Sequence, residues 1–182
     1  MQRNAKAKLA FFRFKQRGVG IVELGLVLII VSIGLVGLYQ KFSSSSTETQ
    51  AADLSSDLAT LVGKVRSAYA GNYGTVTNAK LDTGGFFKGL SSLTDAAGVV
   101  TTNTGGGTLT AAPGTVTAAN DSVQYTITQL PDAACLPLAT GLAKAAAKLT
   151  IGGGVVKAVG TAPNPANITC AGDANTLVLT VQ

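Results

Sequence analysis

The sequence has no histidine and no tryptophan, and only two of its 182 residues are cysteine. The lack of imidazole excludes a Ser-His or Cys-His nucleophile pair and any histidine-containing zinc site. Two thiols are too few for a four-cysteine metal site. The glycine-rich runs lack the order of a phosphate-binding loop, and no acidic loop of the EF-hand type is present. We therefore expect neither an enzyme nor a cofactor-binding protein.

Charge is also scarce. Charged residues make up 13% of the chain and hydrophobic residues 46%, whereas an average domain has about 25% charged residues. This composition argues against a disordered chain, and the length fits one ordinary domain. The formal net charge is +5, but residues 1–18 carry six basic residues and no acid, so the remainder is close to neutral. We expect no nucleic-acid partner, because the basicity is confined to a short N-terminal segment.

Proline is absent before Pro113, so nothing forces a helix break between residues 19 and 70. Residues 19–39 form an apolar run whose only charged residue is Glu23. At about 1.5 Å per residue, a helix of this length covers roughly 31 Å, close to the hydrocarbon thickness of a bilayer. The positive residues that precede the run predict a cytoplasmic N-terminus and a head on the other side of the inner membrane.

Two simpler interpretations of this segment stay open. A cleaved secretory signal needs a small-residue cleavage pattern after the apolar run, and residues 39–46 contain no convincing one. The other is an uncleaved membrane anchor. In an anchor, Glu23 would lie near the headgroup interface, because a carboxylate deep in a membrane is costly and calls for a partner.

The residues around Glu23 follow a specific order: Arg17, Gly18, Val19, Gly20, Ile21, Val22, Glu23. This order resembles the processing site of type IV prepilins, in which a basic leader ends in Gly and Glu is the fifth residue of the mature chain. The 18-residue leader and the valine at the new N-terminus resemble the type IVb branch, which includes plasmid-encoded thin pili and enteric colonisation pili. The resemblance extends over residues 13–42.

This resemblance implies that a prepilin peptidase cuts between Gly18 and Val19 and that the Val19 amine is N-methylated. Glu23 would then pair with the Val19 amine of an adjacent subunit, because opposite charges offset each other's desolvation in a low dielectric. The implied partners are copies of the same chain in a helical filament, the membrane before assembly, and the inner-membrane pilus assembly machinery. The implied location after processing is an extracellular pilus, used in adhesion, conjugation or a related surface function.

Two alternatives in function accompany this prediction. A type II secretion pseudopilin or a minor pilin shares the same N-terminal features. A membrane-anchored, outward-facing binding module that never polymerises belongs to a different class, and cleavage at Gly18 distinguishes it.

The sequence predicts four segments: a basic leader over residues 1–18, a membrane or filament-core helix over 19–42, its amphipathic continuation over 43–70, and a globular head over 71–182. In the continuation, six apolar residues recur at spacings of three and four: Leu54, Leu58, Leu61, Val62, Val65 and Tyr69. The helix is expected to stop just after Tyr69, near Gly71. Glycines and serines between residues 25 and 46 leave a bend, local melting or close helix packing as open alternatives.

In the head, residues 123–128, 154–159 and 176–181 alternate apolar and polar side chains, which predicts strands. The alanine-rich residues 139–149 predict a short helix. Phe86 and Phe87 are expected in the core or in a subunit contact. Because the apolar helix face needs a cover, we expect an α+β fold with an antiparallel sheet packed on the long helix. This is also the ladle fold that the pilin resemblance implies.

Cys135 and Cys170 both fall on the side predicted to lie outside the cytoplasm, which favours a disulfide; two unpaired buried thiols are the alternative. The pair would enclose 34 residues, and the chain-entropy model assigns such a loop roughly 4 kcal/mol of stabilisation. In type IV pilins a C-terminal pair of this kind delimits the D-region. The resemblance therefore makes residues 136–169 the candidate for that region.

Overall fold

The computed structural model describes residues 20–69 and 71–182, in two units that meet between Gln40 and Lys41. Helix α1 (Ile21–Tyr69) contributes to both units, and each unit is described by itself. The predicted processing residues Gly18 and Val19 lie outside the described residues.

Helix α1 is continuous from Ile21 to Tyr69. The glycines and serines between residues 25 and 46 therefore do not interrupt its backbone. The predicted stop after Tyr69 is confirmed. Gly71 adopts a φ of 89°, the left-handed conformation that glycine accepts without strain at a helix end.

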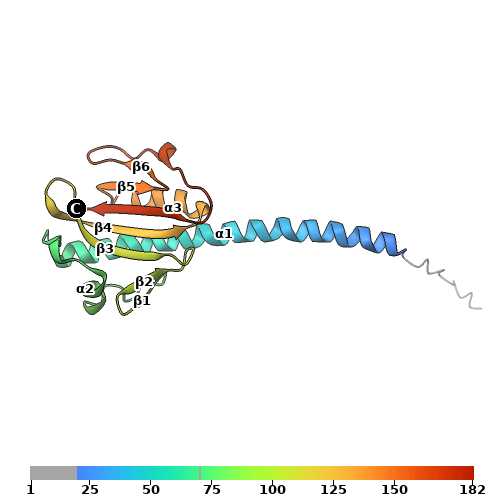
Figure 1. Cartoon of the computed structure of the whole chain (residues 1–182), viewed down its shortest axis with the longest axis horizontal. Helices are drawn as coiled ribbons and strands as arrows, with labels where there is room; N and C mark the ends of the chain where they lie inside the picture. Colours follow the sequence, from blue (N-terminus) through green and yellow to red (C-terminus); the bar gives the residue numbers. More distant parts are fainter. Residues whose placement is uncertain (1–19, 70) are drawn as a thin grey trace, which may run out of the picture. The chain divides into compact units, whose positions relative to one another are not determined.

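The second unit, Lys41–Gln182, contains a seven-stranded sheet in the order β1-β2-β3-β4-β7-β5-β6, with every pair antiparallel. The strands are β1 (Leu93–Ala96), β2 (Val99–Thr102), β3 (Thr108–Thr115), β4 (Ala119–Leu130), β5 (Lys148–Ile151), β6 (Gly154–Lys157) and β7 (Asn175–Val181). In Figure 1, β3 and β4 lie in front of the C-terminal part of α1. The predicted α+β class, with a long helix packed on an antiparallel sheet, is confirmed.

The core lies between this sheet and the amphipathic part of α1. Leu54, Leu58 and Leu61 are fully buried on the helix, as the spacing predicts. Each buried leucine removes enough apolar surface from water to favour folding by about 1.5–3 kcal/mol. On the facing side of the sheet, four neighbouring strands contribute a buried row: Leu109, Ile127, Leu177 and Ile151.

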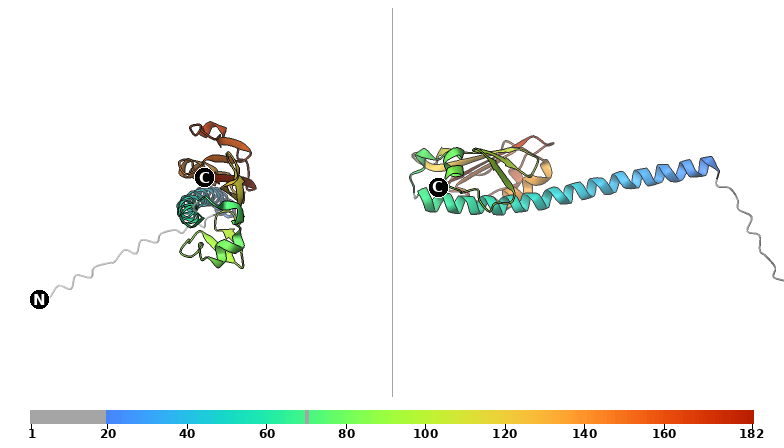
Figure 2. Two further views of the ribbon diagram at one scale, coloured as in Figure 1. Left: turned by 90° about the vertical axis from the view of Figure 1, so that its left-hand side faces the viewer. Right: turned by 90° about the horizontal axis from the view of Figure 1, so that it is seen from below.

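Helix α3 (Asp132–Leu142) covers the same face of the sheet as α1. Figure 2 shows the sheet nearly edge-on, with α1 and α3 on one side of it. Leu138 and Leu142 of α3 are fully buried in the common core. The opposite face of the sheet therefore carries no helix in the described part of the second unit.

The strand predictions are confirmed for β4 and β7, and the prediction over residues 154–159 matches β6 in its first four residues. The predicted helix over residues 139–149 is wrong in its bounds. Helix α3 starts at Asp132, directly after Pro131, and ends at Leu142. Residues from Lys148 instead form β5, because they pair along β7. Tertiary pairing outweighs the helical propensity of the alanines here.

The segment between α1 and β1 contains two short helices, η1 (Tyr73–Thr75) and α2 (Asn78–Thr83). The Asn78 amide donates to the Leu109 carbonyl at 2.6 Å and accepts from the Ala111 N–H at 2.7 Å. One side chain therefore occupies the edge of β3 in the way that a neighbouring strand would. Sequence reasoning missed this role, because it depends on contacts more than 30 residues away.

Candidate functional site

The first unit exposes an unusual amount of apolar surface. Its large aliphatic side chains from Ile21 to Leu38 are between 50% and 89% exposed. Contiguous apolar surface of this extent marks an interaction surface, since water solvates it poorly. A helix that is apolar on all sides is normally covered on all sides. Within the part of the chain that the structure describes, no helix has the combined length and apolarity of a membrane span.

Glu23 lies in the first turn of α1, where its own N–H donates to the Gly20 carbonyl at 2.9 Å. The position suits a carboxylate, because the N-terminus of a helix carries a partial positive charge. The side chain is exposed, and residues 20–40 include no lysine or arginine. Glu23 therefore has no basic partner along this stretch of its own chain.

The second candidate site is the segment bounded by the two cysteines. Cys135 of α3 and Cys170 form a disulfide, with their Cα atoms 6.5 Å apart. The predicted pairing is confirmed. The Cys135 side chain is 1% exposed, so the bond attaches the C-terminal loop to the core. Between the cysteines lie most of α3, the hairpin β5–β6 and the short helix η2 (Pro165–Asn167).

The amide of Asn175 holds the end of this segment. It is 7% exposed, donates to the carbonyls of Leu130 and Gly172 at 2.9 and 3.0 Å, and accepts from the Ala171 N–H at 2.9 Å. The amide therefore joins the end of β4 to the loop that carries Cys170. Sequence reasoning missed Asn175, and no local pattern distinguishes it from the other asparagines.

The loop before Cys170 also covers the edge of the sheet at β6. The Asn167 amide donates to the Val155 carbonyl at 2.8 Å, and the Asn164 N–H donates to the Val156 carbonyl at 2.7 Å. These bonds occupy backbone groups that would otherwise be open to a strand of another chain. The bounded segment is thus a packed part of the head, and its loop residues 158–167 are exposed.

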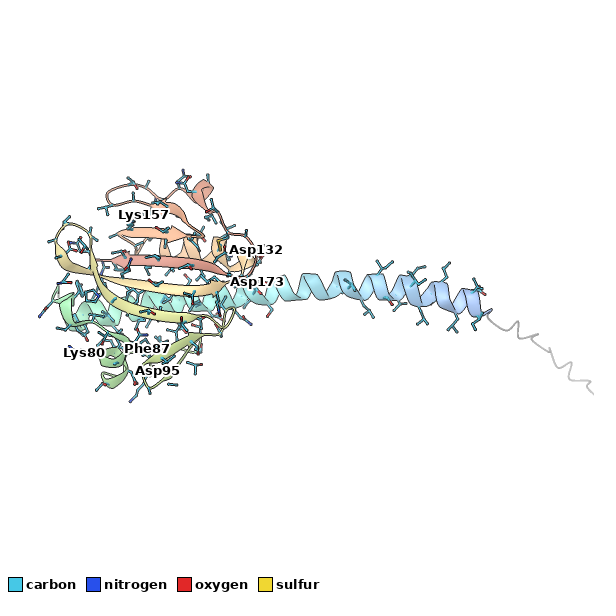
Figure 3. The ribbon with its side chains drawn as sticks, viewed as in Figure 1. Lys80, Phe87, Asp95, Asp132, Lys157 and Asp173 are labelled. Carbon is cyan, nitrogen blue, oxygen red and sulfur yellow. A yellow bond between two sulfur atoms is a disulfide. The ribbon has the colours of Figure 1, made fainter. Side chains whose placement is uncertain are left out.

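Two carboxyl groups approach each other at the opposite end of the sheet. Asp95 of β1 and Asp82 of α2 line a small cavity together with Phe87 and Lys88. Figure 3 shows Asp95 close to Phe87 at this end. Burial raises the pKa of Asp95, and a hydrogen bond to Asp82 and the negative charge of Asp82 raise it further. Among residues 20–69 and 71–182, no group of three or more acidic or cysteine side chains converges as a metal site.

The aromatic pair of residues 84–88 belongs to the core region. Phe87 is 6% exposed, and Phe86 packs against Tyr69 with ring centroids 6.0 Å apart. The Lys64 ammonium of α1 donates to the carbonyls of Phe86 and Lys88 at 3.2 and 3.0 Å. The prediction that these aromatics lie in the core or in a contact is confirmed for the core.

Residues 48–182 match the model of a protein family described as PilS N terminal. The solved structures that resemble the chain include two type IV pilins. One is a type IVb pilin from Salmonella typhi, 20% identical, with a TM-score of 0.47, covering 74% of this chain and 97% of that chain. The other is TcpA, a type IV pilin from Vibrio cholerae El Tor biotype, 19% identical, with a TM-score of 0.45, covering 75% of this chain and 99% of that chain. No curated protein matches the chain. Both TM-scores lie below 0.5, so the family match over residues 48–182 alone shows to which family the chain belongs.

Proposed function

We propose that this chain, which belongs to the PilS N-terminal family of type IVb pilins, is made as a prepilin and matures into the subunit of an extracellular filament. Membership of the family makes it a structural protein without enzymatic activity, and implies self-assembly into a pilus. In the proposed sequence of events, a prepilin peptidase cuts between Gly18 and Val19, and the new Val19 amine is methylated. Cleavage removes all six basic residues of the leader.

The observation that carries the proposal is the exposed aliphatic surface of α1 from Ile21 to Leu38. Burying one such side chain away from water is favourable by about 1.5–3 kcal/mol, so outside the membrane this surface is stable only where copies of the helix cover it. Before assembly, the same surface is buried in the inner membrane with its N-terminus in the cytoplasm, as the basic leader directs. Assembly then exchanges lipid for neighbouring helices.

Glu23 sets the position of each α1 helix along its neighbour in the filament. Within an apolar bundle a lone carboxylate is unfavourable, and pairing with a cationic amine offsets the desolvation of both groups. The Val19 amine of an adjacent subunit is the proposed partner. This role is consistent with the lack of any lysine or arginine among residues 20–40.

The head is proposed to lie on the filament exterior, where residues 136–169 form the D-region bounded by Cys135 and Cys170. Its exposed loop and hairpin are then available to surfaces outside the cell. Adhesion, conjugation or a related surface function follows from this placement.

The test compares Glu23→Gln with Glu48→Gln, an identical substitution at an exposed position of the same helix. Both variants keep the length and apolarity of residues 19–39. Glu23→Gln removes one charge of the proposed pair and leaves the amine unpaired, so pilin recovered from the sheared cell surface falls at least about tenfold while membrane-bound pilin persists. Glu48→Gln leaves both fractions unchanged. Normal assembly of Glu23→Gln would refute the charge-pairing role.

A further inference from the structure

One exposed row of α1 in the second unit consists entirely of small residues. Six exposed residues recur there at spacings of three and four, and none is larger than threonine: Thr49, Ala52, Ser56, Ala59, Gly63 and Ser67. We call these six residues the small-residue stripe. The outer face of a surface helix normally carries charged side chains, which water solvates. Small residues instead allow the backbone of another helix to approach closely.

A groove lies beside the stripe, between α1 and α3. It has a volume of about 460 Å³ and is lined by Ala52, Ser55, Ser56 and Ala59 of α1 and by residues of α3 that include Thr140 and Gly141. We call it the α1–α3 groove. Gly141 has to lack a side chain, because a Cβ atom there would collide with the Ser55 hydroxyl oxygen. From Ala52 to Ala59 the groove follows about two helical turns, roughly 10 Å, which is long enough to seat part of another helix.

Ser55 places a hydroxyl without a partner in this groove. The residue is only 8% exposed, and its hydroxyl makes no hydrogen bond to another group in the described part of the chain. The neighbouring Thr140 hydroxyl, by contrast, donates to the Leu136 carbonyl of its own helix at 2.9 Å. A nearly buried hydroxyl that lacks a partner costs free energy. The groove therefore favours an occupant that brings a hydrogen-bond acceptor to Ser55.

The first unit of the chain has the complementary surface. Its large aliphatic side chains from Ile21 to Leu38 are between 50% and 89% exposed, so they can fill a groove whose own side chains are small. Between residues 24 and 38 the one polar side chain is that of Ser32. The Ser32 hydroxyl donates to the Leu28 carbonyl at 2.7 Å, which leaves its oxygen available as an acceptor.

We infer that residues 21–38 of one copy pack into the α1–α3 groove of a second copy, where Ser55 donates a hydrogen bond to the hydroxyl oxygen of the incoming Ser32. The occupant is a second copy because membership of the pilin family implies self-assembly. The contact joins two different surfaces, so it can repeat from copy to copy without closing, as a filament requires. The inference rests on the proposed filament function and names the surface that receives each helix.

The first test replaces both serines by cysteine, in the double variant Ser32→Cys with Ser55→Cys. The two natural cysteines already bond to each other. In oxidised filaments sheared from cells, each chain of the double variant should bond to two neighbours, so a ladder beyond dimers is expected on a non-reducing gel. Each single variant is a matched control and should form no such ladder. Filaments of the double variant without a ladder would overturn the inference. Dimers of Ser55→Cys alone would also overturn it, because they would place the same groove of another copy at Ser55.

The second test blocks the groove without adding a thiol. Ala59→Leu fills the groove from its exposed rim, and Ala68→Leu makes the same change at an exposed position of α1 outside the groove. Both residue types favour a helix, so the fold is retained. Expected is at least tenfold less sheared pilin for Ala59→Leu, with membrane-bound pilin unchanged, and the wild-type yield for Ala68→Leu.

The wild-type chain in the same experiment separates the two claims. If wild-type filaments form and Ala59→Leu yields as much pilin as Ala68→Leu, the groove contact is wrong and the filament function stands. If the wild-type chain forms no filaments, the proposed function fails and the groove contact fails with it.

Discussion

Asp57 of α1 accepts two hydrogen bonds from Ser92, one from its backbone N–H at 2.8 Å and one from its hydroxyl at 2.6 Å. The two residues are 35 positions apart, and Ser92 is 1% exposed. Ser92 directly precedes β1, so this contact joins the helix to the first strand of the sheet. A charged acceptor makes both hydrogen bonds stronger than neutral ones.

Replacing Asp57 by alanine is expected to lower the unfolding free energy by about 2–4 kcal/mol, because a buried N–H and a buried hydroxyl lose their acceptor. Thermal and denaturant unfolding of the full chain, followed by circular dichroism, measures this change. Asp53→Ala is the control, since Asp53 is exposed on the same helix. A change at Asp57 no larger than that at Asp53 would contradict the account.

Opening the disulfide is expected to cost about 4 kcal/mol of stability, because its loop of roughly 35 residues gains conformational freedom in the unfolded chain. The measurement compares unfolding with and without a reductant. The double variant Cys135→Ser and Cys170→Ser should resemble the reduced protein and show no response to reductant. Equal stability of the oxidised and reduced chains would show that core packing alone holds the bounded segment.

Asp121 is expected to make stability fall in acid. Its carboxylate accepts from the Thr117 hydroxyl at 2.7 Å and from the N–H groups of Ala118 and Val116 at 2.8 Å, and these bonds hold the pKa of Asp121 well below its usual range. A lowered pKa in the folded state stabilises the fold above the unfolded value of about 4, and the gain is lost as the pH falls below it. Asp121→Asn should lower stability at pH 7 and flatten the acid slope.

The control for this prediction is Asp173→Asn, at an exposed loop position. It should leave both the stability at pH 7 and the acid slope unchanged. An unaltered acid slope in Asp121→Asn would show that other carboxylates govern the acid response.

The ionised carboxylate of Asp95 is expected to lower the stability of the fold, whereas that of Asp121 raises it. Because burial, then the hydrogen bond and negative charge of Asp82, raise its pKa, the folded state binds the proton more tightly than the unfolded state. The ionised group therefore weakens the fold above its folded pKa, and this penalty disappears as the pH falls through the unfolded value of about 4. Asp95→Asn should raise the unfolding free energy at pH 7 and give no gain at pH 3. A loss of stability at pH 7 would contradict this sign.

Local patterns predicted the elements whose residues carry a strong period. Leu54, Leu58 and Leu61 recur at helical spacing, and residues 123–128 alternate strictly, so α1 and β4 could be read from the sequence. Strand β3 could not, because Pro113 and Gly114 within it weaken any strand signal. Its place depends on pairing with β4 and on the Asn78 amide, which the local sequence does not encode.

The candidate sites also divide into those that local sequence predicts and those that depend on the folded structure. The pairing of Cys135 with Cys170 was predictable, since the chain has no other thiol. The Asp57–Ser92 contact was not predictable, because it depends on how the helix packs beside the start of β1.

The measurement that tests the central claim most directly is the intact mass and N-terminal sequence of the protein sheared from the cell surface. The account predicts a chain that starts at methylated Val19, with Cys135 and Cys170 oxidised. A chain that starts at Met1 and is found only in membranes would contradict it and would favour an anchored protein that does not polymerise.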